Sequence, residues 1–184
     1  MKPTEVLKEE HQGIKTGLRI LGGIADRLKA GQPVPPEHLE EMVDFIRTFA
    51  DRCHHGKEED LLFVEMEKAG VPKQGGPIAV MLLEHDQGRG YVRAMADAIP
   101  GYKAGDPAAA QKFAQNSYNY IGLLTQHIDK EDNILYVIAD MHLSDEQQAC
   151  LLDGFDRVET ERIGPGKHEE YHRMLERLSG VYLE

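Results

Sequence analysis

Two copies of one short pattern, H-x-x-x-E followed by x-x, two aliphatic residues and an aromatic residue, stand far apart in this chain. The first copy runs from His54 to Phe63 and the second from His127 to Tyr136. Residues four apart lie on the same face of a helix, so each copy places an imidazole beside a carboxylate. A repeat of this kind predicts that two halves of the chain build equivalent parts of one structure.

A Glu-His pair precedes each copy of the pattern. The pairs are Glu10-His11 and Glu84-His85, and they lie 43 and 42 residues before the histidine of their own copy. The duplication therefore extends over most of the chain, and each half supplies two histidines and a glutamate.

Apolar residues recur every three or four positions along four long segments, and Gly and Pro separate these segments. We expect helices from Thr4, as a cap, to Gly31, from Pro36 to about Gly70, from about Ile78 to Gly101, and from Pro107 to about Met141. Sustained strand alternation is absent from the sequence. The pattern predicts an all-α fold in which residues 1–143 form an up-down-up-down four-helix bundle.

Two short helices are expected after this bundle. Ser144 and Gln147 have the spacing of a capping box for the first, and Gly164-Pro165-Gly166 separates it from the second. Both segments are short and polar. We therefore expect residues 144–184 to form a C-terminal helical extension that packs on the bundle.

The candidate metal ligands fall on the apolar stripes of the expected helices. They are His11, His54, Glu58, His85, His127 and Glu131. At about 1.5 Å per residue, the helix lengths put His11 level with His54, and His85 level with His127. Buried carboxylates are costly unless they are paired, which favours a bound divalent cation. Imidazole and carboxylate together suit iron, manganese or zinc, and each Glu, one turn past its His, is placed to bridge two metals.

The segment CHHGKEED in the second helix contains two overlapping candidate pairs of metal ligands. His54 with Glu58 and His55 with Glu59 both have the required spacing. The first pair continues the apolar stripe, whereas the second continues a polar series and is expected to face solvent. We therefore predict that His54 and Glu58 are the ligands.

The ordered set of a His, an HxxxE, a second His and a second HxxxE resembles the hemerythrin-like, or HHE cation-binding, family. The resemblance covers about residues 4–141 and is nearest to the bacterial branch with four histidines and two glutamates. It implies a non-haem di-iron centre, bridged by Glu58 and Glu131, that binds O2, NO or peroxide, with zinc or manganese as alternative metals. In the oxygen-carrying hemerythrins a further His follows the third-helix ligand by one turn, and Arg89 stands there in this chain.

The sequence leaves the use of such a centre open. Turnover of the bound molecule is one hypothesis, and iron handling or O2, NO or redox sensing through a partner is another. A structural zinc site is a third. His168 to His172 also match the HExxH of zinc proteases, although only 12 residues follow, and His168, Glu159 or Glu161 is an alternative extra ligand at the bundle mouth.

Charge and composition restrict the partners. The formal net charge of -11 and the pI near 5.3 oppose binding to nucleic acid and to an anionic membrane surface. The N-terminus lacks the apolar core of a signal peptide, and Cys53 and Cys150 lack the spacing of a redox or thiolate metal motif. We expect a cytoplasmic protein with reduced cysteines, a small ligand, and an unidentified protein partner or electron donor.

Overall fold

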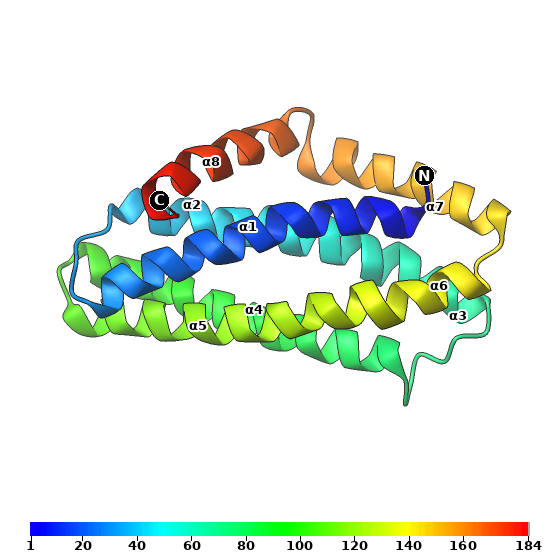
Figure 1. Cartoon of the computed structure of the whole chain (residues 1–184), viewed down its shortest axis with the longest axis horizontal. Helices are drawn as coiled ribbons and strands as arrows, with labels where there is room; N and C mark the ends of the chain where they lie inside the picture. The colour runs from blue at the N-terminus through cyan, green and yellow to red at the C-terminus, as the bar shows by residue number, and fades with distance from the viewer. Residues whose placement is uncertain (184) are drawn as a thin grey trace.

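The computed structural model describes residues 1–183, in which four long helical rods lie side by side (Figure 1). The rods comprise α1 (Pro3–Lys29); α2 (Pro36–Phe45), η1 (Ile46–His55), η2 (Glu58–Leu62) and α3 (Phe63–Lys68); α4 (Pro77–Lys103); and α5 (Pro107–Lys130), η3 (Glu131–Leu135) and α6 (Tyr136–His142). No strand occurs within residues 1–183, which confirms the all-α prediction.

The chain then returns along the outside of the bundle. It forms α7 (Asp145–Arg157), η4 (Val158–Ile163) and α8 (Lys167–Tyr182), and α8 lies over α1 and α2 (Figure 1). Ser144 and Gln147 form the expected capping box. Apolar residues of α8, such as Leu178, belong to the same buried cluster as α1 and α2. The separation of residues 144–184 as a unit of their own remains a prediction.

Two helix ends differ from the sequence prediction. Lys2, not Thr4, is the N-cap of α1, because Pro3 begins the helix at the position where its missing N–H is harmless. Thr4 instead donates its hydroxyl to Asp140 Oδ1 on α6 at 2.8 Å. The C-terminal end of α4 also differs, because this helix continues past Gly101 to Lys103.

The segments η1, η2 and η3 are π-helical; η1 carries His54, and η2 and η3 carry the motif glutamates Glu58 and Glu131. A π turn closes i→i+5 hydrogen bonds and so holds more residues than an α turn. Side chains on these turns therefore depart from the α-helical periodicity that predicts which residues face inward. The rest of each rod is α-helical, so the departure is local.

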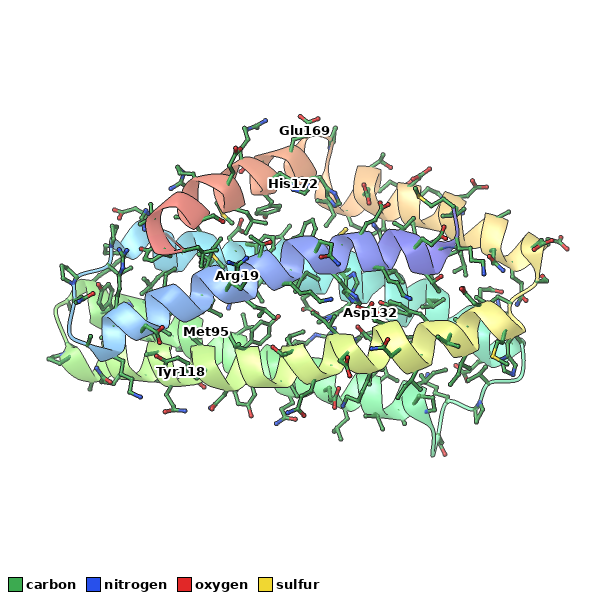
Figure 2. All side chains as sticks on the ribbon, in the orientation of Figure 1. Arg19, Met95, Tyr118, Asp132, Glu169 and His172 are labelled. Carbon is green, nitrogen blue, oxygen red and sulfur yellow. The ribbon has the colours of Figure 1, made fainter. Side chains whose placement is uncertain are left out.

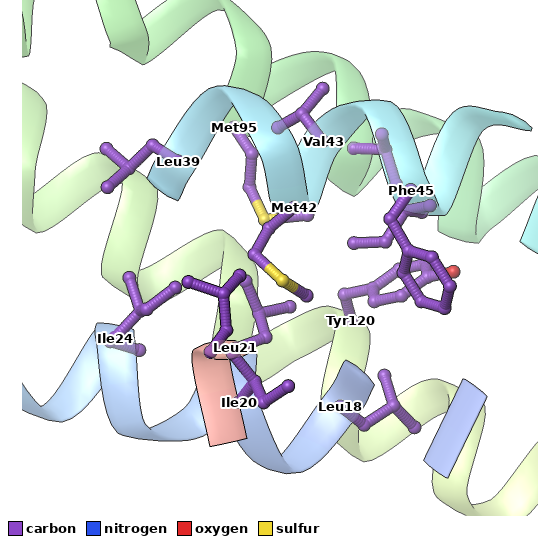
Figure 3. Close-up of a cluster of buried hydrophobic side chains, with 14 of the residues drawn as sticks. Leu18, Ile20, Leu21, Ile24, Leu39, Met42, Val43, Phe45, Met95 and Tyr120 are labelled. Atoms are coloured by element: carbon purple, nitrogen blue, oxygen red, sulfur yellow. The ribbon is translucent and has the colours of Figure 1, made fainter. Parts of the chain in front are cut away.

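Two apolar clusters fill the bundle, and the polar motif residues lie between them. On α1, Leu7 belongs to one cluster and Ile14 to the other, with His11 between. The larger cluster, drawn in Figure 3, brings Met42 of α2 together with Met95 of α4. Burial of these apolar side chains on both sides holds the four rods at fixed spacing around the polar layer. Within residues 1–183 no helix is long and apolar enough to cross a membrane.

Candidate metal centre

The four histidines predicted from the repeat meet in two pairs inside the bundle. His11 Nε2 lies 3.0 Å from His54 Nε2, and His85 Nε2 lies 3.1 Å from His127 Nε2. All four side chains are buried. The antiparallel rods thus bring together residues that stand 43 and 42 positions apart in the chain.

The two predicted glutamates lie beside these pairs and are fully buried. Glu131 reaches both pairs, since its Oε2 is 3.2 Å from His11 Nε2 and its Oε1 is 2.9 Å from His127 Nε2. Glu58 Oε2 lies 3.3 Å from His85 Nε2 and 3.9 Å from His54 Nε2. All six predicted residues therefore surround one small volume.

Each histidine turns its other ring nitrogen, Nδ1, toward a carboxylate outside this volume. These outer carboxylates are Asp132 for His11 (2.7 Å), Glu10 for His54 (2.8 Å), Glu59 for His85 (2.7 Å) and Glu84 for His127 (2.8 Å). Asp132 is visible in Figure 2 beside α1. A carboxylate only accepts hydrogen bonds, so each Nδ1 carries a proton, and Nε2 is the ring nitrogen that faces the interior and can bind a metal there.

The Nε2 pairs have the spacing that a metal ion would give them. Two lone pairs 3.0 Å apart repel each other unless a proton or a cation lies near both. Ligand nitrogens at about 2.0–2.1 Å from one metal and at right angles to each other are about 2.8–3.0 Å apart. Both observed separations are near this value, so the imidazoles fit one metal per pair.

Buried polar atoms without hydrogen-bond partners gather at the same place. The described residues contain five such side-chain atoms, and four of them are Glu58 Oε2, both carboxylate oxygens of Glu131, and His55 Nε2. Buried polar groups are nearly always satisfied, so a cluster of orphaned acceptors indicates a site that binds cations. The donor set of imidazole and carboxylate therefore fits two divalent ions of the iron, manganese or zinc type.

His55 was wrongly expected to face solvent. Only 4% of its surface is exposed, and its ring stacks on His85 with centroids 3.8 Å apart. Its Nδ1 bonds to Asp51 at 3.2 Å, as the other histidines bond to their outer carboxylates. The wide turn of η1 carries both His54 and His55 inward, which α-helical periodicity cannot predict. Its partner in the rejected pair, Glu59, acts as the outer carboxylate of His85.

With His55 included, the candidate ligands divide into two groups. One is His11, His54 and Glu131, and the other is His55, Glu58, His85 and His127. Within each group the ligand atoms all lie within 4.8 Å of one another. We call these seven residues the candidate centre.

The outer carboxylates follow the sequence repeat, although the sequence prediction did not include them. The Glu before each first histidine, Glu10 or Glu84, holds the histidine of the HxxxE motif in the same half. Asp132, which follows Glu131, binds His11, and Glu59, which follows Glu58, binds His85. Each of these acids therefore binds a histidine of the other half. Lys57 and Lys130, at the same place in both motifs, bind Glu10 and Glu84. The extended repeat H-x-x-K-E-[ED] was the signal that could have found them.

Charges inside the site shift the histidine pKa values in different directions. Burial by itself lowers the pKa of His11, but Asp132 and Glu131 outweigh it and raise that pKa to about 9. The pKa of His85 is likewise raised well above its usual value. Burial and the neighbouring His85 hold the pKa of His55 well below its usual value, so His55 stays neutral. Burial raises the pKa of Glu131, yet His127 and His11 bring it well below the usual range.

Tyr136 breaks the symmetry between the halves. Its hydroxyl donates to Glu58 Oε1 at 2.7 Å and lies 3.4 Å from His11 Nε2. Phe63 occupies the equivalent position of the other copy and has no hydroxyl. Burial and the charges of Glu131 and Glu58 raise the pKa of Tyr136 well above its usual value, so the phenol keeps its proton.

Arg89, at the position where the oxygen-carrying hemerythrins have a histidine, does not belong to the candidate centre. Its guanidinium binds Asp51 and Glu59, both at 2.8 Å. Asp51 and Glu59 are the outer carboxylates of His55 and His85, so the Arg89 guanidinium balances the charge of both carboxylates.

The C-terminal alternatives lie elsewhere. His168 and Glu159 approach Glu10 and Cys53 rather than the candidate centre, and the buried Lys57 ammonium binds both Glu10 and Glu159. An ammonium already supplies a cation to this second cluster. Of the HExxH match, Glu169 and His172 are exposed on α8 (Figure 2), and neither belongs to a group with metal-binding geometry among the described residues.

The fold and the buried histidine–carboxylate cluster define a cation-binding four-helix bundle. The family profile described as the hemerythrin HHE cation binding domain matches residues 2–139, and the chain belongs to this family. Uncharacterized proteins of Mycobacterium tuberculosis and Mycobacterium bovis are 28% identical over 160 residues. The match covers 87% of this chain and 62% of those relatives. No solved structure matches the chain significantly.

Proposed function

We propose that the candidate centre holds two iron ions and binds a small diatomic molecule or peroxide: O2, NO or H2O2. The observation that carries the proposal is the pair of Nε2–Nε2 contacts at 3.0 and 3.1 Å beside three orphaned carboxylate oxygens. Two cations would satisfy all of these atoms together.

The ligand assignment follows the two groups of the candidate centre. His11 and His54 would bind one iron, and His55, His85 and His127 the other. Glu131 is suited to bridge the ions, because its two oxygens approach His11 and His127 separately. Glu58 has one oxygen committed to Tyr136, so its Oε2 is the atom available to the metals. The side with fewer histidines has room for an exogenous ligand.

The chain's own residues would hold and shield a bound molecule. Iron would supply an open coordination position and electrons for redox chemistry. Tyr136 donates its proton to Glu58 Oε1, and its hydroxyl lies 3.4 Å from His11 Nε2, so it holds that carboxylate oxygen beside the group with fewer histidines. The outer carboxylates fix ring orientation and increase the basicity of each imidazole. The apolar clusters above and below exclude bulk water from this layer.

The test begins with protein produced in iron-replete medium. Metals per chain are quantified, and the visible spectrum of the reduced form is recorded before and after limiting O2. We expect about two irons per chain and a new oxidation-dependent band, and H2O2 or NO then tests the ligand range by stopped flow. The variant His85→Ala should lose most of one iron, whereas His142→Ala, at an exposed position on α6, should keep both. Stoichiometric zinc, or no metal after iron reconstitution, would refute the di-iron proposal.

A second candidate function is iron handling or sensing through a partner. It is favoured by a continuous chain of contacts from His54 through Glu10 and Lys57 to Glu159 on η4. A change of ligation at His54 can therefore reach the C-terminal helices. Sensing predicts that metal or NO changes amide hydrogen exchange in residues 158–170 while the bound molecule is not turned over. Sustained peroxide or O2 consumption with unchanged exchange there would favour catalysis.

A further inference from the structure

Five of the eight large apolar side chains that are exposed within residues 1–183 lie on two neighbouring rods. They are Val80 and Leu83 of α4, Ile134 of η3, and Val137 and Met141 of α6, with exposed fractions from 44% to 75%. The start of α4 and α6 lie at the same end of the bundle (Figure 1). We call these five residues the apolar patch.

The two rods adjoin at the apolar patch. The partly buried side chains of Leu82 and Ile138 pack against the same buried cluster, so they join the two halves of the patch. The Lys130 ammonium of α5 binds the Glu84 carboxylate of α4, next to Leu83. The patch is therefore one continuous surface rather than a set of scattered exposed residues, and a continuous surface of this kind marks an interaction site.

The C-terminal helices cover the other side of the bundle. α8 lies over α1 and α2, and α7 contacts α1 and η2 (Figure 1). The return of the chain thus covers the outer faces of the first two rods, whereas the side chains of the apolar patch stay exposed on the other two.

The apolar patch contains no charge, although charged residues make up 29% of the chain. Residues 77–83 and residues 133–139 contain no Asp, Glu, Lys or Arg. The acids at the ends of these stretches are held in ion pairs: Glu84 with Lys130, Asp86 with Arg89, and Asp140 with Lys2. Paired acids offer little attraction to a basic partner. Two copies of a chain of net charge -11 repel each other where their acids meet, so an uncharged surface is where they can approach.

We propose that the apolar patch is the contact between two copies of this chain in a two-fold symmetric dimer. Such a contact uses the same surface on both copies. Homodimer interfaces are more apolar than contacts between different proteins, and charged residues are depleted at their centre. A second copy therefore fits the patch better than a charged partner does. The inference concerns the outside of the bundle and does not rest on the proposed di-iron function.

The first test measures the mass of the chain in solution across a range of concentrations, by sedimentation or by light scattering. The mass should rise from 20.7 kDa toward twice that value as the concentration increases. Higher salt should strengthen the association, because it screens the repulsion between two acidic chains. A chain that stays monomeric at every concentration would overturn the proposal, and so would a dimer that salt weakens.

Variants then locate the contact. Leu83→Lys and Met141→Lys each place an ammonium in the apolar patch and should weaken dimerisation by at least about tenfold, because a buried unpaired charge is costly. The matched control is Val181→Lys, which makes the same charge change at an exposed valine of α8 and should keep the native association within about twofold. All three replaced side chains are exposed, so circular dichroism should show an unchanged fold. Equal association of Leu83→Lys and Val181→Lys would refute the assignment of the dimer to this surface.

Methionine oxidation tests the contact in the native chain. Met141 and Met1 are 75% and 79% exposed, and only Met141 belongs to the apolar patch. Chloramine-T should oxidise Met141 more slowly in concentrated, dimeric protein than in dilute protein, whereas Met1 should react at the same rate in both. Equal rates at Met141 would show that another surface forms the dimer and would overturn the proposal. None of these results depends on bound iron, so the di-iron proposal stands or fails separately.

Discussion

The variant Lys57→Met should measure how much the free energy of unfolding depends on one buried charge, the Lys57 ammonium, next to the candidate centre. Lys57 has 0% of its surface exposed, and its ammonium binds Glu10 and, at 2.6 Å, Glu159. Burial by itself lowers the pKa of Lys57, but Glu10 and Glu159 raise it above the usual value, so the group remains charged. Lys57→Met preserves much of the volume and removes only the cation.

The expected loss of unfolding free energy depends on how exposed the two partners of Lys57, Glu10 and Glu159, are. The Glu10 side chain is 6% exposed, whereas that of Glu159 is 37% exposed and can be solvated when the ammonium is gone. Leaving one charge of a buried pair uncompensated costs about 3–5 kcal/mol. Glu10 keeps the Nδ1–H of His54, so we expect the lower end, about 3 kcal/mol. With a typical urea m value of about 1–3 kcal/mol/M, the midpoint should fall by about 1–3 M.

The assay is urea unfolding of the metal-free protein, followed by circular dichroism. Lys68→Met is the matched control, because Lys68 makes a similar contact to Glu65 with 64% of its side chain exposed. It should cost less than about 1 kcal/mol. The double variant Glu10→Gln/Lys57→Met, which removes both charges, should recover about half of the single loss. A loss below about 1 kcal/mol for Lys57→Met, or a double variant no better than the single one, would refute this reasoning.

Three further predictions concern the same bundle. In the metal-free protein the pKa of His11 is about 9, against 6.5 in the unfolded chain. Protonation of His11 therefore stabilises the fold fully below pH 6.5, and this stabilisation is lost as the pH rises to about 9. Chemical denaturation across this pH range should show the decline in the free energy of unfolding. The iron-loaded protein should show the opposite slope, since metal and protons compete for Nε2, and equal slopes would contradict this account. Gly17→Ala should cost about 1–3 kcal/mol in thermal unfolding, because the new Cβ would lie 2.5 Å from Phe45 Cε1. Gly22→Ala on the same helix, whose nearest neighbour would be 3.7 Å away, should be neutral or stabilising. Tyr136→Phe should cost about 1–3 kcal/mol in the metal-free protein, by leaving Glu58 Oε1 without its donor; an unchanged unfolding midpoint would show that this hydroxyl contributes nothing.

The amino-acid sequence by itself determined the helical bundle and the convergence of six polar residues. A period of 3.6 residues fixes which side of a long helix is apolar, and His11 and His85 stand on that side. Equal helix lengths on either side of a turn then put His11 level with His54. These arguments need only the geometry of one helix and the antiparallel direction of its neighbour.

Tertiary structure decided which residues complete and support the candidate centre. His55 turns inward because η1 is a π-helix, and the i→i+5 turns alter the register that α-helical periodicity assumes. The outer carboxylates depend on the rotation of each rod about its own axis, so Glu84 meets His127 only when α4 and α5 are placed together. The surroundings of Lys57 depend on the C-terminal helices, because Glu159 of η4 binds the Lys57 ammonium. Periodicity describes a single helix, whereas each of these contacts depends on how two or three rods are set against one another.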